Sequence, residues 1–142
     1  MTGKAEIRFI GEVEAAGDSS TIRLFPDYCE GLLGIESYSH LILLYWLHLK
    51  DDEGNRSTLK VRPPRHGGAP LMGVFGTRSP SRPNPIGLSV VKLESVEGCR
   101  LVVRGLDALE GSPIVDVKPY SPRSDSVPEA RTPEWSTRGP PS

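Results

Sequence analysis

Residues 71–92 read LMGVFGTRSPSRPNPIGLSVVK, and the fold prediction starts from this stretch. The apolar runs Leu71–Phe75 and Ile86–Leu93 predict two buried strands. A ten-residue loop with two arginines, three prolines and an asparagine separates them. Each proline fixes its own φ and moves the preceding residue toward an extended conformation. We therefore expect the loop to be largely ordered before any ligand binds.

The polar side chains of this loop suit the recognition of an anion or a base. Arg78 and Arg82 each present a planar set of N–H donors that matches a carboxylate, a phosphate or a stacked base. Asn84 adds an amide that can donate and accept at once. A proline-rich surface turn with solvated arginines explains the same residues equally well, because loops carry both functional and neutral side chains. Both interpretations stay open at this point.

The remaining chain predicts a mainly β protein. Apolar runs or period-two alternation predict further strands at residues 7–13, 21–25, 40–48, 90–96, 100–109 and 114–120. Asp27 is expected to cap a short helix that runs to Leu33 and ends at Gly34. Several short strands joined by turns indicate a single-sheet antiparallel β-barrel with short helices, since closure removes the sheet edges.

The length of 142 residues favours one domain, which we place at residues 1–122. Residues 123–142 are rich in proline, serine and charge and predict an extended C-terminal tail. Trp135 is expected to dock on the domain or on a second subunit. No apolar run approaches the about 18 residues of a membrane span, so we expect a soluble, cytoplasmic protein. Cys29 and Cys99 show no CxxC spacing, and neither a disulfide nor a metal site is expected.

Charge is distributed unevenly along the chain although the net charge is only −1. Residues 1–55 carry 4 basic and 10 acidic side chains, whereas residues 56–104 carry 9 basic and 2 acidic ones. A local cationic excess suits a polyanion such as RNA. An ordinary charged surface is the alternative, because a linear count does not place the arginines on one face.

Motifs for several common chemistries are absent from the sequence. There is no GxGxxG, GxxxxGK[ST], HExxH or GxSxG pattern. Asp116 interrupts an apolar run and is the best candidate for an acid that accepts a proton or orients an amine. Asp116 and Lys118 also share one strand face and could form a simple ion pair. Tyr120 could stack on a base or could be a core or rim tyrosine.

Four strings of the sequence resemble the TsaA-like (TrmO) family. They are GVFGTRSPSRPNPIGLS at 73–89, VRPPRHGG at 61–68, GLDALEGSPIVDVKPYSP at 105–122 and DSVPEA at 125–130. The resemblance covers about residues 35–135, and the TRSPSRPNPIGLS string is long and specific. It implies an S-adenosylmethionine-dependent methyltransferase that modifies N6 of threonylcarbamoyladenosine at position 37 of tRNA. It also implies a β-barrel that forms a homodimer.

The resemblance assigns roles to individual residues. It implies cofactor contacts at His48, Arg78, Leu88, Glu110, Gly111, Ser112 and Pro113. At residues 110–113 this sequence reads EGSP, where the family usually has DGTP. From the chemistry of methyl transfer, and not from the resemblance, we expect Asp116, or Tyr120 through hydrogen bonding, to assist the loss of the N6 proton. Arg62, Arg65, Arg82, Asn84 and Lys118 would contact the tRNA.

The N-terminal part departs from the family pattern. Members commonly carry an SPxxxxxxPRQ-like segment after the first strand, and residues 11–25 contain nothing similar. Two other functions therefore stay open beside the tRNA methyltransferase. One is a non-catalytic barrel that binds an adenosyl metabolite or RNA, and the other is a methyltransferase for a small molecule.

Overall fold

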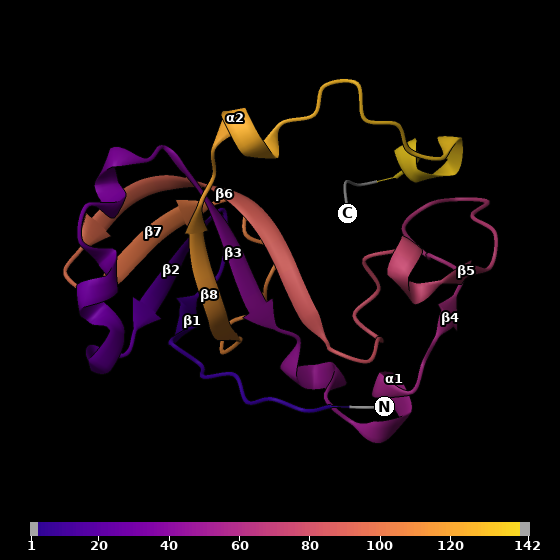
Figure 1. Cartoon of the computed structure of the whole chain (residues 1–142), viewed down its shortest axis with the longest axis horizontal. Helices are drawn as coiled ribbons and strands as arrows, with labels where there is room; N and C mark the ends of the chain where they lie inside the picture. The colour runs from indigo at the N-terminus through magenta and orange to yellow at the C-terminus, as the bar shows by residue number, and fades with distance from the viewer. Residues whose placement is uncertain (1–2, 140–142) are drawn as a thin grey trace. The chain divides into compact units, whose positions relative to one another are not determined.

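The computed structural model describes residues 3–139, and six antiparallel strands in this range form a closed barrel (Figure 1). The strand order around the barrel is β1–β2–β7–β6–β3–β8. The strands are β1 (Gly11–Ala15), β2 (Ser19–Leu24), β3 (His40–Trp46), β6 (Ile86–Glu97), β7 (Arg100–Arg104) and β8 (Pro113–Pro119). The prediction of a mainly β, single-sheet antiparallel barrel is confirmed.

The chain divides into two compact units. The barrel unit contains the residues up to His48 and Ile86–Tyr120, and the loop unit contains Leu49–Pro85 and the residues from Ser121 onward. The barrel unit also holds the 3₁₀ helices η1 (Pro26–Leu32) and η2 (Ile35–Ser37). The helices of the loop unit are α1 (Glu53–Arg56), η4 (Val74–Gly76), α2 (Pro122–Asp125) and η5 (Glu134–Thr137). Its two-stranded sheet consists of β4 (Lys60–Val61) and β5 (Met72–Gly73). A further 3₁₀ helix, η3 (His48–Lys50), lies where the barrel unit passes into the loop unit.

The barrel core is formed by the buried residues that alternate with more exposed ones along each strand. Successive side chains of a strand point to opposite faces, so every second residue enters the barrel. In β3 the inward residues Leu41, Leu43 and Tyr45 are buried, whereas their neighbours are half-buried. The other fully buried core side chains come from the same period on the remaining strands: Val13, Ile22, Leu24, Val91, Leu101, Val103 and Ile114. Within residues 3–139, none of the helices has the length and apolar character needed to cross a bilayer.

Ion pairs lie side by side on the outer face of β1, β2 and β7. Arg23 contacts Glu12, and Arg100 donates two hydrogen bonds to Glu14 at 2.8 and 3.0 Å. The hydrogen bond from Arg100 lowers the pKa of the Glu14 carboxyl below its ordinary value. Because these pairs face solvent, they contribute little to stability, but they match charges across neighbouring strands.

Some predicted elements are shorter than expected or differ in type. The strand predicted at Leu71–Phe75 is only Met72–Gly73, and the 3₁₀ helix η4 follows it directly. The strand predicted at residues 40–48 ends at Trp46. Asp27 does not cap a helix, because Phe25 occupies the N-cap position of η1 and makes no side-chain cap bond. These segments are too short for periodicity to define their ends.

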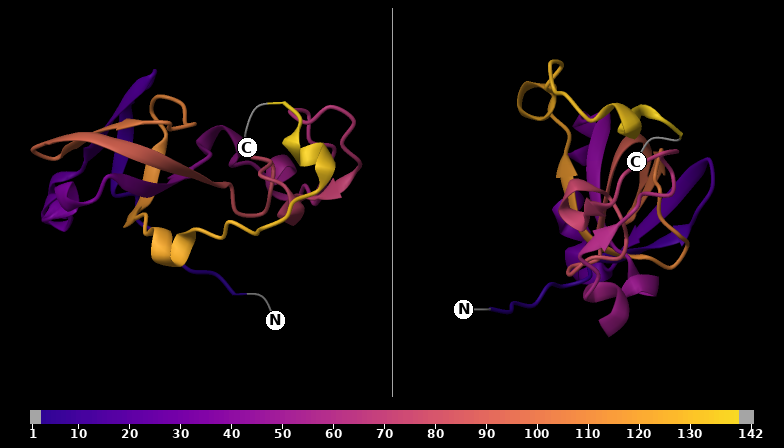
Figure 2. Two further views of the ribbon diagram at one scale, coloured as in Figure 1. Left: turned by 90° about the horizontal axis from the view of Figure 1, so that it is seen from above. Right: turned by 90° about the vertical axis from the view of Figure 1, so that its right-hand side faces the viewer.

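The C-terminal segment of the loop unit contacts the loop at residues 62–69. The ring of Trp135 lies edge-on to the ring of His66 at 5.4 Å, and His66 is 5% exposed. The Nδ1 atom of His66 lies 2.6 Å from the carbonyl oxygen of Arg138. Both views in Figure 2 show η5, in yellow, beside this loop. Within the loop unit, Trp135 therefore packs against His66.

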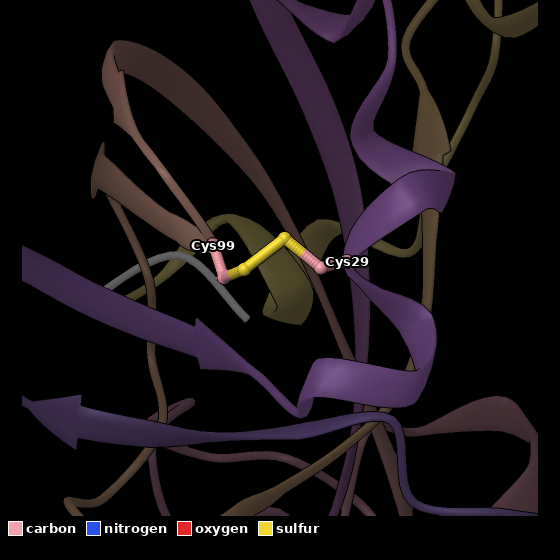
Figure 3. Close-up of a disulfide and its surroundings, with 2 residues drawn as sticks. All are labelled: Cys29 and Cys99. Atoms are coloured by element: carbon pink, nitrogen blue, oxygen red, sulfur yellow. A yellow bond between two sulfur atoms is a disulfide. The ribbon is translucent and has the colours of Figure 1, made fainter.

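Cys29 and Cys99 form a disulfide, and the prediction that no disulfide is present was wrong. The bond joins η1 to the turn between β6 and β7, and the two Cα atoms are 5.3 Å apart (Figure 3). Spacing along the sequence gave no sign of it, because 70 positions separate the two cysteines and the pairing of β2 with β7 brings their segments together. The bond links an irregular segment to the barrel.

We predict that the disulfide stabilises the barrel mainly by restricting the unfolded chain. For a loop of 70 residues the chain-entropy relation gives about 4 kcal/mol as an upper value. The double variant Cys29→Ser/Cys99→Ser should lose up to this amount in urea unfolding at pH 7. Dithiothreitol should lower the stability of the unaltered chain to the same level and leave the variant unchanged. If dithiothreitol left the unfolding stability of the unaltered chain unchanged, the prediction would be contradicted.

Candidate functional site

The residues predicted for the site fall in both units. The barrel unit contains His48, Leu88, Glu110, Gly111, Ser112, Pro113, Asp116, Lys118 and Tyr120. The loop unit contains Arg62, Arg65, Arg78, Arg82 and Asn84.

Two of the predicted residues lie in one row on the outer face of the barrel. Leu88 of β6 pairs with Leu44 of β3, and Leu44 pairs with Asp116 of β8. Since neighbouring strands are about 4.8 Å apart, the row spans roughly 10 Å. The side chain of Leu88 is 42% exposed, so the row presents an apolar surface next to a carboxylate.

Asp116 forms the ion pair that the sequence offered as an alternative to a catalytic role. Its Oδ2 atom lies 3.4 Å from Nζ of Lys118, and Oδ1 accepts a hydrogen bond from the amide of Val117 at 2.9 Å. The carboxylate is nevertheless 46% exposed and keeps room for a further hydrogen bond. Asp116 also lines a cavity of about 360 Å³ between β8 and η1, whose other walls are mostly apolar.

The turn at residues 110–113 is hydrogen-bonded to β1. Gly111 has a φ of +86°, which a side chain at this position would strain. The amide of Gly111 donates to the carbonyl of Val13 at 2.8 Å, and the amide of Val13 donates to the carbonyl of Ser112 at 2.9 Å. The amide of Ser112 donates to the carbonyl of Leu109. The amides of Gly111 and Ser112 therefore fix the turn, and Glu110 stands exposed at its tip.

His48 and Tyr120 stand at strand ends of the barrel unit. His48 begins η3, two residues beyond the end of β3, and is half-buried. Tyr120 follows β8, and its amide donates to the carbonyl of His40 at 3.1 Å. Both side chains are accessible enough to contact a ligand.

Arg78 and Arg82 have different environments in the proline-containing loop. Arg82 is half-buried, and its Nη1 atom donates to the carbonyls of Thr77 and Ser79 at 3.0 and 3.1 Å. Arg78 is exposed and makes no hydrogen bond or ion pair with any residue from 3 to 139. Arg82 thus fixes the shape of the loop, whereas the guanidinium of Arg78 is open to a ligand.

Helix α1 connects to the same loop through its N-cap. The carboxylate of Asp52 accepts hydrogen bonds from the backbone and the side-chain amide of Asn55 at 2.9 and 2.7 Å. These bonds, the backbone one most strongly, lower the pKa of Asp52 below its ordinary value. The side-chain oxygen of Asn55 in turn accepts from the hydroxyl of Ser81 at 2.6 Å. The cap and the loop are therefore parts of one hydrogen-bonded structure.

Two more arginines donate to loop carbonyls. Nε of Arg56 donates to the carbonyl of Pro83 at 2.8 Å, and its Nη2 atom reaches Oδ1 of Asn84 at 3.4 Å. Nη1 of Arg62 donates to the carbonyl of Ala69 at 2.9 Å. Asn84 and Arg62, predicted to contact substrate, therefore also stabilise the loop unit. Arg65 is exposed near the docked C-terminal segment.

The cationic block of the sequence is divided by the fold. Six of its nine basic residues belong to the loop unit, and Lys92, Arg100 and Arg104 belong to the barrel. Arg100 and Arg104 contact the carboxylates of Glu14 and Glu94. In the loop unit, Arg56 contacts the carboxylate of Asp51 in the same way. Most basic residues of the block nevertheless belong to the loop unit. In the part of the chain that the structure describes, no three His, Cys, Asp or Glu side chains are grouped around a possible metal position.

The model for the tRNA-methyltransferase O N-terminal domain matches residues 11–126. An S-adenosyl-L-methionine-binding protein of Archaeoglobus fulgidus is 53% identical over 108 residues, which are 76% of this chain and 73% of that protein. The tRNA (adenine(37)-N6)-methyltransferase of Escherichia coli is 46% identical over 105 residues. This match covers 71% of the chain but only 44% of the E. coli enzyme.

A solved structure described as the crystal structure of TrmO is similar in fold. The TM-score is 0.71 at 35% sequence identity, over 92% of this chain and 64% of that one. The chain thus spans less than two thirds of that protein. The matched range 11–126 starts at β1 and runs past the end of β8, so it includes all six barrel strands and the proline-containing loop.

We predict that Arg82 contributes to the order of the loop and that Arg78 does not. Arg82→Ala removes two donors to backbone carbonyls, which are worth about 1–3 kcal/mol together in a half-buried site. The amides of Ser79 and Ser81 should then exchange hydrogen faster by roughly one to two orders of magnitude. Arg78→Ala is the matched control and should leave this exchange unchanged. Equal exchange in the two variants would refute the assignment.

Proposed function

The chain belongs to the tRNA-methyltransferase O family, and from this we propose that it is an S-adenosylmethionine-dependent methyltransferase acting on tRNA. The observation that carries the proposal is the family match, which covers the whole barrel and the arginine loop. The specific acceptor we propose is N6 of threonylcarbamoyladenosine at position 37. The name of the E. coli relative, a tRNA (adenine(37)-N6)-methyltransferase, supports the position and the atom.

The geometry supports a set of cofactor contacts in each unit. In the barrel unit we assign His48, Leu88 and the turn Glu110–Pro113, and in the loop unit Arg78. Leu88 offers an exposed apolar wall, and Arg78 offers a guanidinium without a partner among residues 3–139. A guanidinium suits the carboxylate of S-adenosylmethionine, and an apolar wall suits its aliphatic chain or its adenine ring. Residues 1–122 would form the catalytic domain and 123–142 its tail.

The tRNA contacts are assigned to residues that present cations or amides. They are Arg62, Arg65, Arg82, Asn84 and Lys118. Arg62 uses one terminal nitrogen on one backbone carbonyl, and Arg82 uses one terminal nitrogen on two. A guanidinium has five N–H donors. The remaining donors can contact phosphate without releasing the loop. Because some N–H donors of these arginines hold the loop and others remain for phosphate, the tRNA would bind to an ordered surface.

Methyl transfer to N6 requires in-line positioning and the loss of one N6 proton. S-adenosylmethionine supplies an electrophilic methyl group on its sulfonium. The chain's own contribution is to fix the acceptor, from which most of the rate can come. We assign proton acceptance to the Asp116 carboxylate, with Tyr120 hydrogen-bonding to the acceptor. Asp116 is exposed enough for this role, and Lys118 lies beside it to stabilise the anion.

Homodimer formation and a cytoplasmic location are parts of the same proposal. The outer face of β6 exposes Ile86, Leu88 and Val90 by 37%, 42% and 47%. Three apolar side chains in consecutive outward positions support burial against a second copy. Light scattering of the purified chain measures the oligomeric state directly.

The proposed function predicts methyl transfer from labelled S-adenosylmethionine to total tRNA. Nucleoside analysis should find the label in methylated threonylcarbamoyladenosine, and a rise in salt should weaken tRNA binding steeply because phosphate contacts release counterions. Cofactor binding without any labelled RNA would favour the second candidate, a binding-only protein. The name of the 53% identical Archaeoglobus relative, which mentions binding alone, gives that candidate its support.

The proton-acceptor assignment predicts a selective loss in Asp116→Asn. The amide keeps the size and the hydrogen bond to Val117 but cannot take up a proton. Turnover should fall by roughly two orders of magnitude while cofactor affinity stays within about twofold. Asp18→Asn is the matched control, because it makes the same change at an exposed carboxylate that lies outside the proposed site. Full turnover by Asp116→Asn with bound cofactor would remove Asp116 from the mechanism.

A further inference from the structure

A buried hydrogen-bonded group connects the barrel wall to the loop between β7 and β8. The hydroxyl of Tyr45, on β3, donates to the carbonyl of Asp107 at 2.7 Å and lies 3.0 Å from Oγ of Ser89, on β6. The amide of Asp107 donates to Oγ of Ser89 at 3.3 Å. Tyr45 and Ser89 are 4% and 7% exposed, so water is largely excluded from the bond between the two hydroxyls, while the two bonds to Asp107 are partly buried.

The chemistry of the groups fixes the direction of every bond. A backbone amide can only donate and a carbonyl can only accept, and each hydroxyl has one proton. The carbonyl of Asp107 can only accept, so it takes the single proton of Tyr45. The bond between the two hydroxyls is therefore donated by Ser89, which accepts in turn from the amide of Asp107. The three bonds form a closed cycle in which each hydroxyl donates once and accepts once. Such a cycle is more stable than its separate bonds because each bond polarises the next.

The register of the barrel places both hydroxyls at this point. Tyr45 pairs with Gly87, and Ser89 pairs with Leu43, so Tyr45 and Ser89 are diagonal neighbours on the inner face. A Cβ atom at position 87 would overlap the Tyr45 ring, with only 2.7 Å to its Cζ atom. Glycine at 87 therefore lets the ring cross the neighbouring strand and direct its hydroxyl to the loop.

The loop that the cycle fixes is the one that carries the turn at 110–113. Residues 105–112 connect β7 with β8. Leu106 and Ala108 pack against the barrel core on either side of Asp107. Beyond them, the amide of Gly111 and the carbonyl of Ser112 bond to Val13 of β1. The loop is thus fixed at two places, and the exposed tip at Glu110 stands between them.

We propose that Tyr45 and Ser89 are positioning residues for cofactor binding, which act through Asp107 on the turn Glu110–Pro113. The inference rests on the proposed function, since it assigns the cofactor to this turn. Neither hydroxyl touches the cofactor. Their effect is to pre-order the turn, so that binding does not have to supply the cost of ordering it.

The test uses Tyr45→Phe and Ser89→Ala in the full chain, with Tyr38→Phe as the matched control. Tyr45→Phe keeps the ring over Gly87 and removes only the hydroxyl, and Tyr38 is a surface tyrosine at 45% exposure. Affinity for S-adenosylmethionine is measured by calorimetry below the onset of unfolding. Each of the two variants should bind roughly three- to tenfold more weakly, because a broken cycle leaves buried partners unsatisfied. The control should bind as the unaltered chain does.

Three further readouts separate positioning from simple loss of stability. The KM for the cofactor should rise at constant kcat, and the amides of Gly111 and Ser112 should exchange faster. The double variant should bind about as weakly as either single one, because the first change already opens the cycle. Variants that melt earlier but bind the cofactor as tightly as the unaltered chain would overturn the proposal.

The proposed function and this inference fail in different ways. No binding by the unaltered chain would overturn the proposed function and, with it, the cofactor role of the cycle. Hydrogen exchange needs no ligand, and unchanged exchange at Gly111 and Ser112 in Tyr45→Phe would overturn the positioning step even if the unaltered chain binds and methylates.

Discussion

The register between β3 and β6 is the constraint on which the rest of the structure depends. Seven residue pairs, from His40 with Lys92 to Trp46 with Ile86, fix it. A slip by one residue would turn every side chain of one strand to the opposite face. The observed register puts Tyr45 over Gly87 and Ser89 inside the barrel, and it turns Leu88 outward. The core, the cycle at Asp107 and the proposed cofactor wall therefore follow from a single alignment of two strands.

Closure of the barrel depends on a strand pairing with fewer residue pairs than that of β3 with β6. Strands β1 and β8 share only two residue pairs, Gly11 with Ile114 and Glu12 with Pro113. The turn at 110–113 extends this contact, because Val13 bonds to both Gly111 and Ser112. The segment proposed to contact the cofactor thus also closes the sheet. A ligand that orders this turn would stabilise the whole barrel, since binding to the native state alone raises stability.

The sequence predicted the barrel well because its signal is local. Period-two burial within each strand, as in Leu41, Leu43 and Tyr45, needs no knowledge of the neighbours. Features that depend on neighbours were missed. Cys29 and Cys99 come together only through the pairing of β2 with β7, and the partners of Tyr45 are known only once the register is known. The short 3₁₀ helices have too few residues for any period to appear.

The arginines of the loop unit show a second limit of sequence patterns. Proline has no N–H, so a proline-rich loop has more carbonyl acceptors than backbone donors. Side-chain donors can make up the difference, and Arg82, Arg56 and Arg62 donate to carbonyls at residues 77, 79, 83 and 69. A cationic, proline-rich segment therefore does not by itself indicate an anion site. Arg78 is the better ligand candidate because the loop carbonyls within residues 3–139 do not engage it.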